Sequence, residues 1–578
     1  MRLEAISVGR TRTIEMRSGA VPTAYLKTPV AGKCYVEAGG LQGNETAVHP
    51  DAVYAIAAEH YEYWALRLGV DRSAWRAGHF AENLTIAGLD ESQLRIGDVI
   101  AVGSEVELIV AGPRIPCFKL SWSLGQPDTF IREFGLSGRA GVYLGVRRSG
   151  WIEAGMPVDI LHREPAHPTV AEVSKLALDC PHPPEEMLRT LLALPYFSRS
   201  AALVLEAALM RAIDGRADTG TWRDWREFIV TCVVDECLDV RSFTLRPTDD
   251  GPLPRARAGQ FVVVQVPGTS GQDPIIRPWS LSDWAHRPSG YRISVKRQAD
   301  GVGSSRLHES VREGTRLNIR PPSGQFMLDR SVFMPVVLIG AGIGITPLLA
   351  MAKAHLARGS SAPKLRMIHC VRSGDFHPLR EEIDLLAERH PKLRVRYVYS
   401  RPTDEDVARQ RFHQRGHLIV DDVLAELKDL SITLGNKEVS VPWFECDFYI
   451  CGPEGLEGEL TRRLIERGGR QSRIFCERFQ PAGDQAASQS IESAQVVFAR
   501  SGQSLVWTQS ENLSLLELAE RSGLAPPSGC RIGVCSSCQC GLLEGDVRYE
   551  FRPIADVSGR TALLCCAKPA TARVVLDL

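Results

Sequence analysis

The sequence lacks an excess of charge, a long apolar run and an internal repeat. Its formal net charge is −1 over 578 residues, which gives no long-range attraction to nucleic acid or to an anionic membrane. The most apolar stretch, Val336–Ala352, contains three glycines and a proline, so it indicates a strand, a turn and a helix rather than a membrane span. The N-terminal residues alternate apolar and polar side chains, unlike a signal peptide. We therefore expect a cytoplasmic protein that binds neither nucleic acid nor membranes.

The length is too great for one hydrophobic core, and the local patterns divide the chain. Residues 1–165 are rich in β-forming runs, with one helix expected at about Asp51–Leu68, and they predict a mostly β, barrel-like domain. Residues 166–220 have helical spacing and predict a helical appendage that ends in a linker.

The second half of the chain begins with renewed β patterns over residues 221–328. Strands and helices then alternate over residues 329–480, which implies a parallel, doubly wound sheet. The polar stretch 481–493 predicts a flexible linker, and residues 494–578 form a further compact α/β unit. We therefore expect a multidomain protein.

The cysteines gather near the C-terminus. Six of the fifteen lie in the last 50 residues, and without a secretion signal thiol chemistry is expected rather than disulfides. Cys530, Cys535 and Cys538 follow the spacing C-x4-C-x2-C, and Cys565 and Cys566 come later. Three thiolates on one loop and a fourth from a distant segment suit a 2Fe–2S cluster. A structural zinc site, which usually has paired C-x2-C units, is the alternative.

A cation, an aromatic ring and a hydroxyl occur within four residues at Arg277–Ser280. A flavin site needs these three groups for the phosphate, the ring system and N5, although a solvated arginine and a core tryptophan are the alternative. A small-residue turn downstream opens a helix and can place N–H groups on phosphate. The flavin candidates are Arg277, Trp279, Ser280, Ser294, Lys296, Gly303, Ser304 and Ser305.

Glycines follow the strand that begins at Val336, in the run Gly340–Pro347. They let a dinucleotide approach the backbone at a helix N-terminus, and Cys451 ends another strand, where an open parallel sheet normally binds its ligand. Ser400 and Arg401 could bind a 2′-phosphate or lie on the surface, so NADH and NADPH both stay open. The nucleotide candidates are Gly342, Gly344, Thr346, Pro347, Cys451, Gly452 and Pro453.

These motifs carry two resemblances. Through RPWS, GAGIGITP and CGP, residues 222–480 resemble the ferredoxin–NADP reductase superfamily, which implies an antiparallel β-barrel flavin domain and places Glu477 near the flavin–nicotinamide contact. The domain order resembles the phthalate dioxygenase reductase group, whereas the local sequence around RPWS resembles the reductase half of flavohaemoglobins. FMN and FAD therefore both stay open as the flavin, and we favour FAD. The last segment resembles plant-type ferredoxins, which implies a β-grasp α+β fold with Cys565, or its neighbour Cys566, as the fourth ligand.

In the N-terminal domain, Cys117 lies on a loop between Arg114 and Lys119. Cationic neighbours favour the thiolate that a soft metal requires, whereas a buried inert cysteine is the alternative. The runs KTPV, GLQGN, FAENLT and PRIPCFK, with His49, resemble the MOSC domain (molybdenum cofactor sulfurase C-terminal) over residues 1–165. Two departures stand out: Asn44 replaces the aspartate of the family's G-D, and Ala81 replaces the glycine of its F-G-E-N.

The MOSC resemblance implies a pterin molybdenum cofactor with Cys117 on the metal. The pocket residues that it implies are Lys27, His49, Asn83 and Arg114. Our hypothesis is an NAD(P)H-dependent oxidoreductase that passes electrons through flavin and the 2Fe–2S cluster to this cofactor and reduces N-hydroxylated compounds such as hydroxylamines and N-hydroxylated bases. The alternative is a reductase component for a separate oxygenase or another acceptor protein, with the MOSC domain as an accessory, sensing or sulfur-carrier domain.

Overall fold

A computed structural model describes most of the chain in two compact units. One unit is Met1–Arg216 with Arg330–Phe333 and Leu430–Pro442, and the other is the remainder. The described residues are 1–16, 19–45, 51–180, 183–214, 222, 225–249, 251–268, 274–299, 301–329, 333–359, 362–434, 437–477, 491–528, 533, 537–549, 553, 557 and 559–578. His49, Cys530, Cys535 and most of both expected linkers lie outside them.

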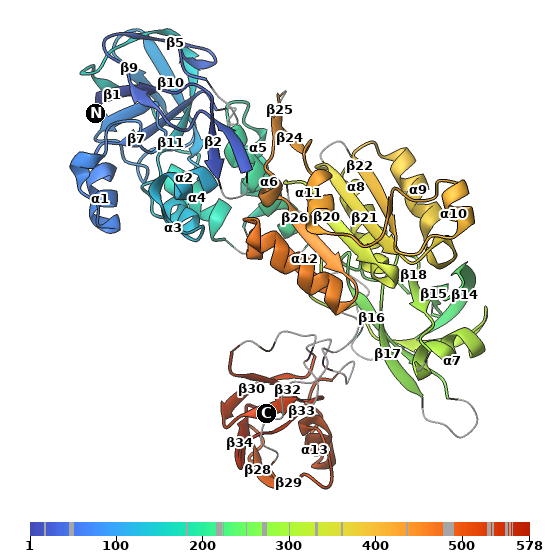
Figure 1. Ribbon diagram of the computed structural model, residues 1–578. Helices are drawn as coiled ribbons and strands as arrows, with labels where there is room; N and C mark the ends of the chain where they lie inside the picture. Colours follow the sequence, from blue (N-terminus) through green and yellow to red (C-terminus); the bar gives the residue numbers. More distant parts are fainter. Residues whose placement is uncertain are drawn as a thin grey trace. The chain divides into compact units, whose positions relative to one another are not determined.

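The first unit is built on a curled, mixed eight-stranded sheet (Figure 1). Only β7 and β8 pair in parallel, and the other neighbours are antiparallel. The order ends at β13 and β4, and the backbone also joins β1 to the residues before β13, through Leu3 N–H to Met156 O (3.0 Å) and Val158 N–H to Met1 O (2.9 Å). The sheet therefore curls into a half-barrel, which agrees in part with the barrel-like domain that we expected. In sheet order the strands are β13 (Val158–His162), β9 (Val99–Val102), β10 (Val106–Pro113), β11 (Val142–Arg148), β7 (Val53–Ala57), β8 (Leu84–Ala87), β1 (Arg2–Val8) and β4 (Thr28–Pro29).

Smaller sheets complete the β structure of this unit. They are β12 (Gly150–Ile152) with β5 (Cys34–Glu37) and β6 (Gly40–Leu41), β2 (Arg12–Met16) with β3 (Gly19–Thr23), and β24 (Ser431–Leu434) with β25 (Lys437–Ser440).

The expected helix at Asp51–Leu68 is wrong in its first half. Val53–Ala57 form strand β7, and helix α1 begins only at Glu59. All five residues of β7 are buried, and the strand lies between β11 and β8. A short apolar run buried on both faces suits a central strand as well as a helix, and pairing with its neighbours decides the outcome.

The helical appendage belongs to the same core as the sheet. Val170, Leu188 and Leu205 are fully buried in one cluster with sheet residues such as Val110. A capping box between Thr169 and Glu172 begins the first appendage helix. The helices of this unit are α1 (Glu59–Leu68), α2 (Phe118–Leu124), α3 (Phe130–Leu136), α4 (Val170–Leu178), α5 (Glu185–Ala193) and α6 (Arg199–Asp214).

The second unit begins with a six-stranded antiparallel sheet and helix α7 (Val302–Ser310). A bridge between Leu281, which follows β17, and Ile293 in β18 joins the two ends of this sheet. In order the strands are β17 (Ile275–Ser280), β16 (Phe261–Val266), β19 (Arg316–Ile319), β14 (Arg226–Cys237), β15 (Val240–Pro247) and β18 (Tyr291–Lys296).

A parallel sheet of six strands follows, as the alternating pattern predicted. In order they are β23 (Gln414–Arg415), β22 (Leu393–Tyr399), β21 (Leu365–Val371), β20 (Val336–Ala341), β26 (Asp447–Cys451) and β27 (Ile474–Glu477). The chain leaves β20 toward β21 and later returns to β26 on its other side, so the strand order reverses beside β20. Such a switch point is where open α/β sheets bind ligands.

Helices cover the parallel sheet, with α8 against β20 and β26 and α9 against β22 (Figure 1). They are α8 (Ile345–Leu356), α9 (Arg380–Arg389), α10 (Asp404–Ala408), α11 (Val420–Ala425) and α12 (Glu454–Glu466).

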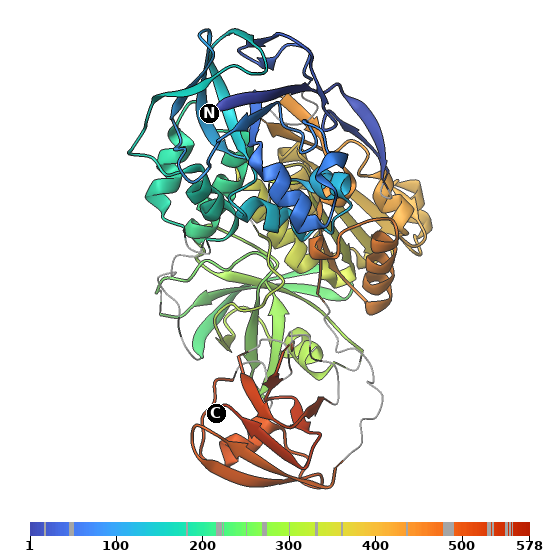
Figure 2. The same cartoon turned by 90° about the vertical axis from the view of Figure 1, so that its left-hand side faces the viewer.

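The C-terminal residues form a five-stranded mixed sheet with one helix, drawn in red in Figure 2. Trp507 and Phe498 are fully buried beneath α13 (Leu515–Arg521). The strands are β29 (Gln503–Thr508), β28 (Ser493–Phe498), β34 (Arg573–Leu576), β30 (Gln539–Glu544) and β32 (Thr561–Leu563), with a pair formed by β31 (Val547–Tyr549) and β33 (Ala567–Pro569). Within the described ranges, every helix is too short or too polar to cross a bilayer.

Candidate functional site

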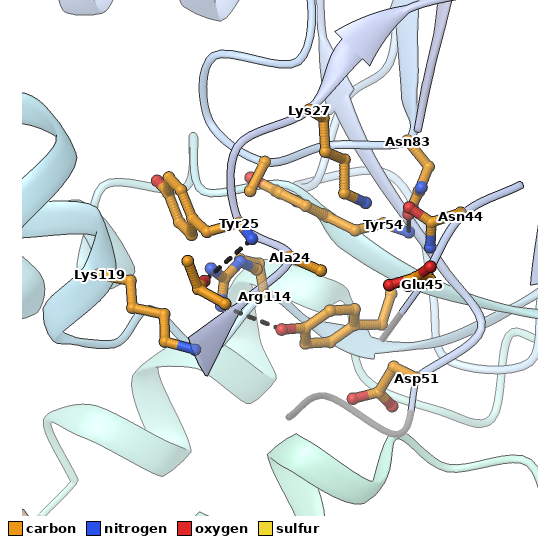
Figure 3. Close-up of a pocket in the computed structure, with 13 residues that line it drawn as sticks. Ala24, Tyr25, Lys27, Asn44, Glu45, Asp51, Tyr54, Asn83, Arg114 and Lys119 are labelled. Carbon is orange, nitrogen blue, oxygen red and sulfur yellow. Dashed lines mark hydrogen bonds between the residues drawn. The ribbon is translucent and has the colours of Figure 1, made fainter. Parts of the chain in front are cut away.

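A pocket in the first unit gathers cationic and aromatic side chains (Figure 3). Its empty space, including the open mouth, is about 530 Å³. The side chains come from strands β3, β7 and β11, from helix α2 and from the loops beside them, so folding of the curled sheet assembles the pocket. The lining residues are Thr23, Ala24, Tyr25, Lys27, Asn44, Glu45, Asp51, Tyr54, Ala81, Asn83, Arg114, Lys119 and Tyr143.

Arg114 lies at the centre of this pocket, directly after β10. Its side chain is 3% exposed, donates a hydrogen bond to the Tyr143 hydroxyl (3.0 Å) and lies 5.1 Å from the centre of the Tyr54 ring. Its backbone N–H donates to Gly141 O (3.0 Å). Burial of a permanently charged guanidinium costs free energy unless an anion or aromatic faces compensate it.

Two lysines add to the positive charge. Burial, with the charge of Arg114, lowers the pKa of Lys27 to about 7 even though the Glu82 carboxylate opposes the shift. Burial also lowers the pKa of Lys119, whose ammonium donates to Pro22 O (3.2 Å). In Figure 3 the Lys27 ammonium lies between Tyr54 and Asn83 inside the pocket. An anionic ligand would raise both values and remove the cost of the three cations.

Cys117 adjoins this pocket as the residue that begins α2. Its thiol is half-buried, and its charge acts on Tyr25, Arg114 and Lys119. Tyr25 is 5% exposed, and its hydroxyl has no hydrogen-bond partner among the described residues. A buried polar group without a partner is costly, so this hydroxyl is suited to a ligand group.

Asn83 and its neighbours in FAEN support the pocket wall. The Asn83 amide bridges two strands, donating to Ser7 O (3.2 Å) and accepting from Tyr54 N (3.1 Å). Glu82 is fully buried and accepts from Gly78 N (2.6 Å), Thr85 and Tyr61. Ala81 has φ +67°, a conformation that favours glycine, which explains why the family has glycine here.

Asp51 links the pocket to the helical appendage. Its carboxylate accepts hydrogen bonds from Arg199 N (3.0 Å) and Ser200 N (3.3 Å) at the beginning of α6. An acceptor here satisfies backbone N–H groups that a helix leaves without partners. The Asn44 amide oxygen accepts from Gly9 N (3.1 Å) and so holds its loop in place. His49, expected in this pocket, lies outside the described residues.

The flavin candidates divide into two groups. Arg277 is exposed at β17 and lies against α7, because a Cβ on Gly303 would come within 3.0 Å of Arg277 Cγ. The structure therefore places the RPWS arginine beside the first turn of α7, which contains Ser304 and Ser305. Trp279 is half-buried and Ser280 is 9% exposed.

Ser294 and Lys296 take part in local contacts. The Ser294 hydroxyl lies 2.6 Å from that of Ser242 and 2.7 Å from that of Ser282, and Lys296 lies 3.3 Å from Asp239. Ser294 thus lies in a buried hydroxyl network, and Lys296 in an ion pair.

The two nucleotide motifs meet at the switch point of the parallel sheet. A Cβ on Gly344 would lie 2.2 Å from Cys451 O, and one on Gly452 would lie 2.9 Å from Ala341 Cβ. Only glycine fits such close approaches. Thr346 and Pro347, both buried in α8, follow directly, and Pro453 is the residue before α12. The loop after β20 and the loop after β26 are therefore in contact.

Glu477 ends β27 beside Cys451. Burial raises the pKa of this carboxyl to about 8, and one of its oxygens is buried with no hydrogen-bond partner among the described residues. Burial, and then the nearby Glu477, raise the pKa of the Cys451 thiol. A neutral, unpartnered acid at the switch point is the kind of group that marks a site. Arg401, the candidate 2′-phosphate ligand, is exposed after β22.

Two of the four proposed cluster cysteines are described. The Cys538 sulfur accepts from Cys565 N (3.4 Å), and the Cys565 sulfur accepts from Gly533 N (3.3 Å) in the cysteine loop. Cys566 is 7% exposed and points to Leu563 O (3.7 Å). Both sulfurs therefore lie near Gly533 of the cysteine loop, since a Cβ on Gly533 would come within 2.8 Å of Cys566 Sγ, and among the described residues only the Cys565 sulfur accepts an N–H from this loop.

The sequence motifs did not identify Tyr25, Tyr54 and Tyr143, which line the pocket, or Glu82, which supports its wall. Tyr25 stands two residues before Lys27, and Glu82 stands directly before Asn83. Their closeness in the sequence to these candidate residues could have identified both. Tyr54 and Tyr143 lie on paired strands with no local motif.

Family models match three segments of the chain. They are the MOSC domain over residues 43–159, the oxidoreductase NAD-binding domain over 338–461 and the 2Fe-2S iron-sulfur cluster binding domain over 500–570. The chain joins a MOSC domain, a flavin- and NAD-binding oxidoreductase module and a 2Fe–2S ferredoxin domain. It is therefore an enzyme of the oxidoreductase class, and the three expected resemblances are confirmed.

Curated proteins resemble about half of the chain. The flavohemoprotein of Rhodopirellula baltica is 33% identical over 296 residues, which are 50% of this chain and 66% of that protein. The flavohemoprotein of Deinococcus radiodurans is 36% identical over 270 residues, 46% of this chain and 62% of that protein. The chain thus spans less than two thirds of the length of these curated relatives.

Among solved structures, phthalate dioxygenase reductase is 24% identical with a TM-score of 0.42, covering 61% of this chain and 98% of that one. The flavohem-like FAD/NAD binding domain of nitric oxide dioxygenase from Vibrio cholerae is 28% identical with a TM-score of 0.37, covering 45% of this chain and 100% of that one.

Proposed function

We propose that this chain is a self-contained NAD(P)H-dependent reductase of N-hydroxylated compounds. Two electrons from NAD(P)H and two protons convert an N–OH group into N–H and water. The bound flavin, 2Fe–2S cluster and pterin molybdenum cofactor would supply hydride acceptance, one-electron transfer and the final two-electron reduction. The observation that carries the proposal is the cationic pocket beside Cys117.

The residues of this pocket fit an anionic cofactor and a small substrate. Lys27, Arg114 and Lys119 supply positive charge, and the buried Tyr25 hydroxyl supplies a hydrogen bond that no described residue takes. Cys117 would be the thiolate ligand of the metal. The Lys27 ammonium, with a pKa of about 7, can give up a proton near neutral pH.

In the second unit we infer a flavin-binding antiparallel barrel and a β-grasp ferredoxin domain. Arg277 and the turn before α7 would hold the flavin phosphate, and the loops around Gly344 and Cys451 would hold the nicotinamide nucleotide. We favour FAD, and either NADH or NADPH serves as donor. Cys530, Cys535, Cys538 and Cys565 would hold the cluster.

The experiment is a count of iron, flavin and molybdenum in protein purified anaerobically from a host that makes molybdenum cofactor. We expect about one molybdenum and one flavin per chain with about two irons. Cys117→Ser should lose molybdenum and hydroxylamine reduction but keep NAD(P)H-driven dye reduction. Cys34→Ser, a buried cysteine of the same unit outside the pocket lining, should keep all of them.

Iron and flavin without molybdenum, in a host that loads another molybdoenzyme, would refute the self-contained reductase. Electrons would then go to a separate acceptor protein. Sulfane sulfur bound on Cys117 would instead support a sulfur-carrier role.

A further inference from the structure

A series of buried hydrogen bonds ends on the glycine-containing loop that follows β20. His369 in β21 lies 2.9 Å from Gly342 O through Nε2 and 3.1 Å from His377 Nε2 through Nδ1. The Nδ1 atom of His377 lies 2.7 Å from the Tyr399 hydroxyl, which accepts from Arg380 (2.9 Å). His369, His377 and Tyr399 are at most 4% exposed, so water does not compete for these bonds.

The donor and the acceptor of every hydrogen bond in this series follow from its last acceptor, Gly342 O. Gly342 O can only accept, so His369 Nε2 carries the proton and its Nδ1 must accept. His377 Nε2 therefore donates to His369, and the Tyr399 hydroxyl donates to His377 Nδ1. Burial keeps both imidazoles neutral by lowering their pKa values, to about 4 for His369.

The bond from His369 to Gly342 O helps to fix the orientation of one peptide plane, together with the hydrogen bond that Ile345 N–H donates to the same oxygen. In a trans peptide the C=O and the following N–H point in opposite directions, and Gly342, with φ +54°, has the backbone freedom to turn this plane. Because the C=O points to β21, the Ile343 N–H points to the opposite side of β20. On that side lie β26 and the Cys451 loop.

We propose that His369, held by His377 and Tyr399, is a positioning residue for the nicotinamide nucleotide: it fixes the Gly342–Ile343 peptide so that its N–H faces the dinucleotide phosphates. This inference rests on the nucleotide role given above to the loop after β20. A pre-oriented N–H strengthens phosphate binding at a helix N-terminus. We therefore expect His369, His377 and Tyr399 to affect the affinity for the nucleotide and not the chemical step.

The test uses the full chain, with NADH and NADPH as probes and ferricyanide as electron acceptor. His369→Leu removes the side-chain donor to Gly342 O and leaves only the backbone donor Ile345 N–H among the described residues, whereas His369→Gln puts an amide N–H near the position of Nε2. We expect His369→Leu to raise KM for the preferred nucleotide about 2- to 10-fold, the range for one lost neutral hydrogen bond, with kcat changed less than about twofold. His369→Gln should restore most of the wild-type KM.

His355→Leu is the matched control. His355 is also buried and lies 2.9 Å from a backbone carbonyl, Pro363 O, but it stands in the last turn of α8, about 15 Å along the helix from the loop. This variant should lose thermal stability as His369→Leu does and keep the wild-type KM.

Three results would overturn the proposal: an unchanged KM in His369→Leu, a KM in His369→Gln as high as in His369→Leu, or an equal rise in His355→Leu. If His369→Leu does not fold, Tyr399→Phe decides, because it removes one oxygen atom and should raise KM about twofold; an unchanged KM there would also overturn it. Absence of NADH and NADPH oxidation by the wild-type chain would refute the proposed function instead.

Discussion

Replacing Glu91 by glutamine should change how the stability of the first unit depends on pH. Glu91 is 1% exposed, accepts hydrogen bonds from Gly141 N (2.7 Å) and Ala140 N (3.3 Å), and lies 3.5 Å from His60 Nδ1. The turn that it holds is part of the pocket frame, because Gly141 O accepts from Arg114 N and Ala140 O accepts from the Tyr54 hydroxyl. A glutamine keeps one acceptor for this turn and cannot ionise.

The sign of the effect on stability follows from the pKa values of Glu91 and His60, which are shifted in opposite directions. Burial raises the pKa of Glu91 from 4.5 to about 7, with Asp90 adding to the rise and Arg139 opposing it. The folded state therefore holds a proton that the unfolded state releases, and this contribution to stability is lost as pH rises through about 7. Burial, with Arg139, lowers the pKa of His60 from 6.5 to about 4 against the pull of Asp90, so its contribution is lost as pH falls.

In the wild-type chain these slopes oppose each other where they overlap, between pH 4.5 and 6.5. Glu91→Gln removes one of them. At roughly 1.4 kcal/mol per pH unit for one proton, the stability of the variant relative to wild type should increase by up to about 3 kcal/mol between acid and neutral pH. This change adds to a pH-independent cost of about 1–3 kcal/mol for the one N–H that loses its acceptor oxygen. Its stability should then rise with pH through the range in which wild type is flat.

The assay is pulse proteolysis of the full chain in urea at several pH values, with fragments of the first unit identified by mass spectrometry. This isolates one unit of a multidomain protein, which is not expected to unfold in one two-state step. Glu91→Ala is the control, because it also removes the charge but leaves the two N–H groups without acceptors and should cost about 1–3 kcal/mol each. A Glu91→Gln profile parallel to wild type from pH 4.5 to 7 would refute the reasoning.

Three further predictions concern single positions. Ala81→Gly should stabilise the first unit by about 1 kcal/mol in the same proteolysis assay, because φ +67° strains an alanine. Cys565→Ser should abolish the visible absorption and electron paramagnetic resonance of the 2Fe–2S cluster, whereas Cys566→Ser should keep both, since only the Cys565 sulfur accepts an N–H from the described part of the cysteine loop. Glu477→Gln should remove a pKa near 8 from the pH profile of kcat/KM for the nicotinamide nucleotide, because Glu477 is neutral below about that pH and charged above it.

The sequence predicted best what short motifs encode. The run Gly340–Pro347 and the residues Cys451–Pro453 are local signals of a strand, a turn and a helix, and the structure joins them at one switch point. The helix expected over residues 51–68 shows the limit, because the apolar run Val53–Ala57 suits either structure and only its neighbours β11 and β8 decide.

Groups that act across the fold have no local signal. Glu91 reaches a turn 49 and 50 residues further along the chain, and His369 reaches Gly342 across 27 residues. Neither residue stands in a motif, so its role depends on which strands become neighbours. Such residues are found by following buried polar atoms to their partners rather than by reading spacing.

The pattern of buried charge distinguishes the two candidate sites. The nucleotide side buries neutral groups, namely Glu477 with its raised pKa and two uncharged histidines. The pocket beside Cys117 instead holds Lys27, Arg114 and Lys119, a set that costs free energy until an anion binds. The charge of the pocket therefore predicts that an anion binds there, as the proposed cofactor would.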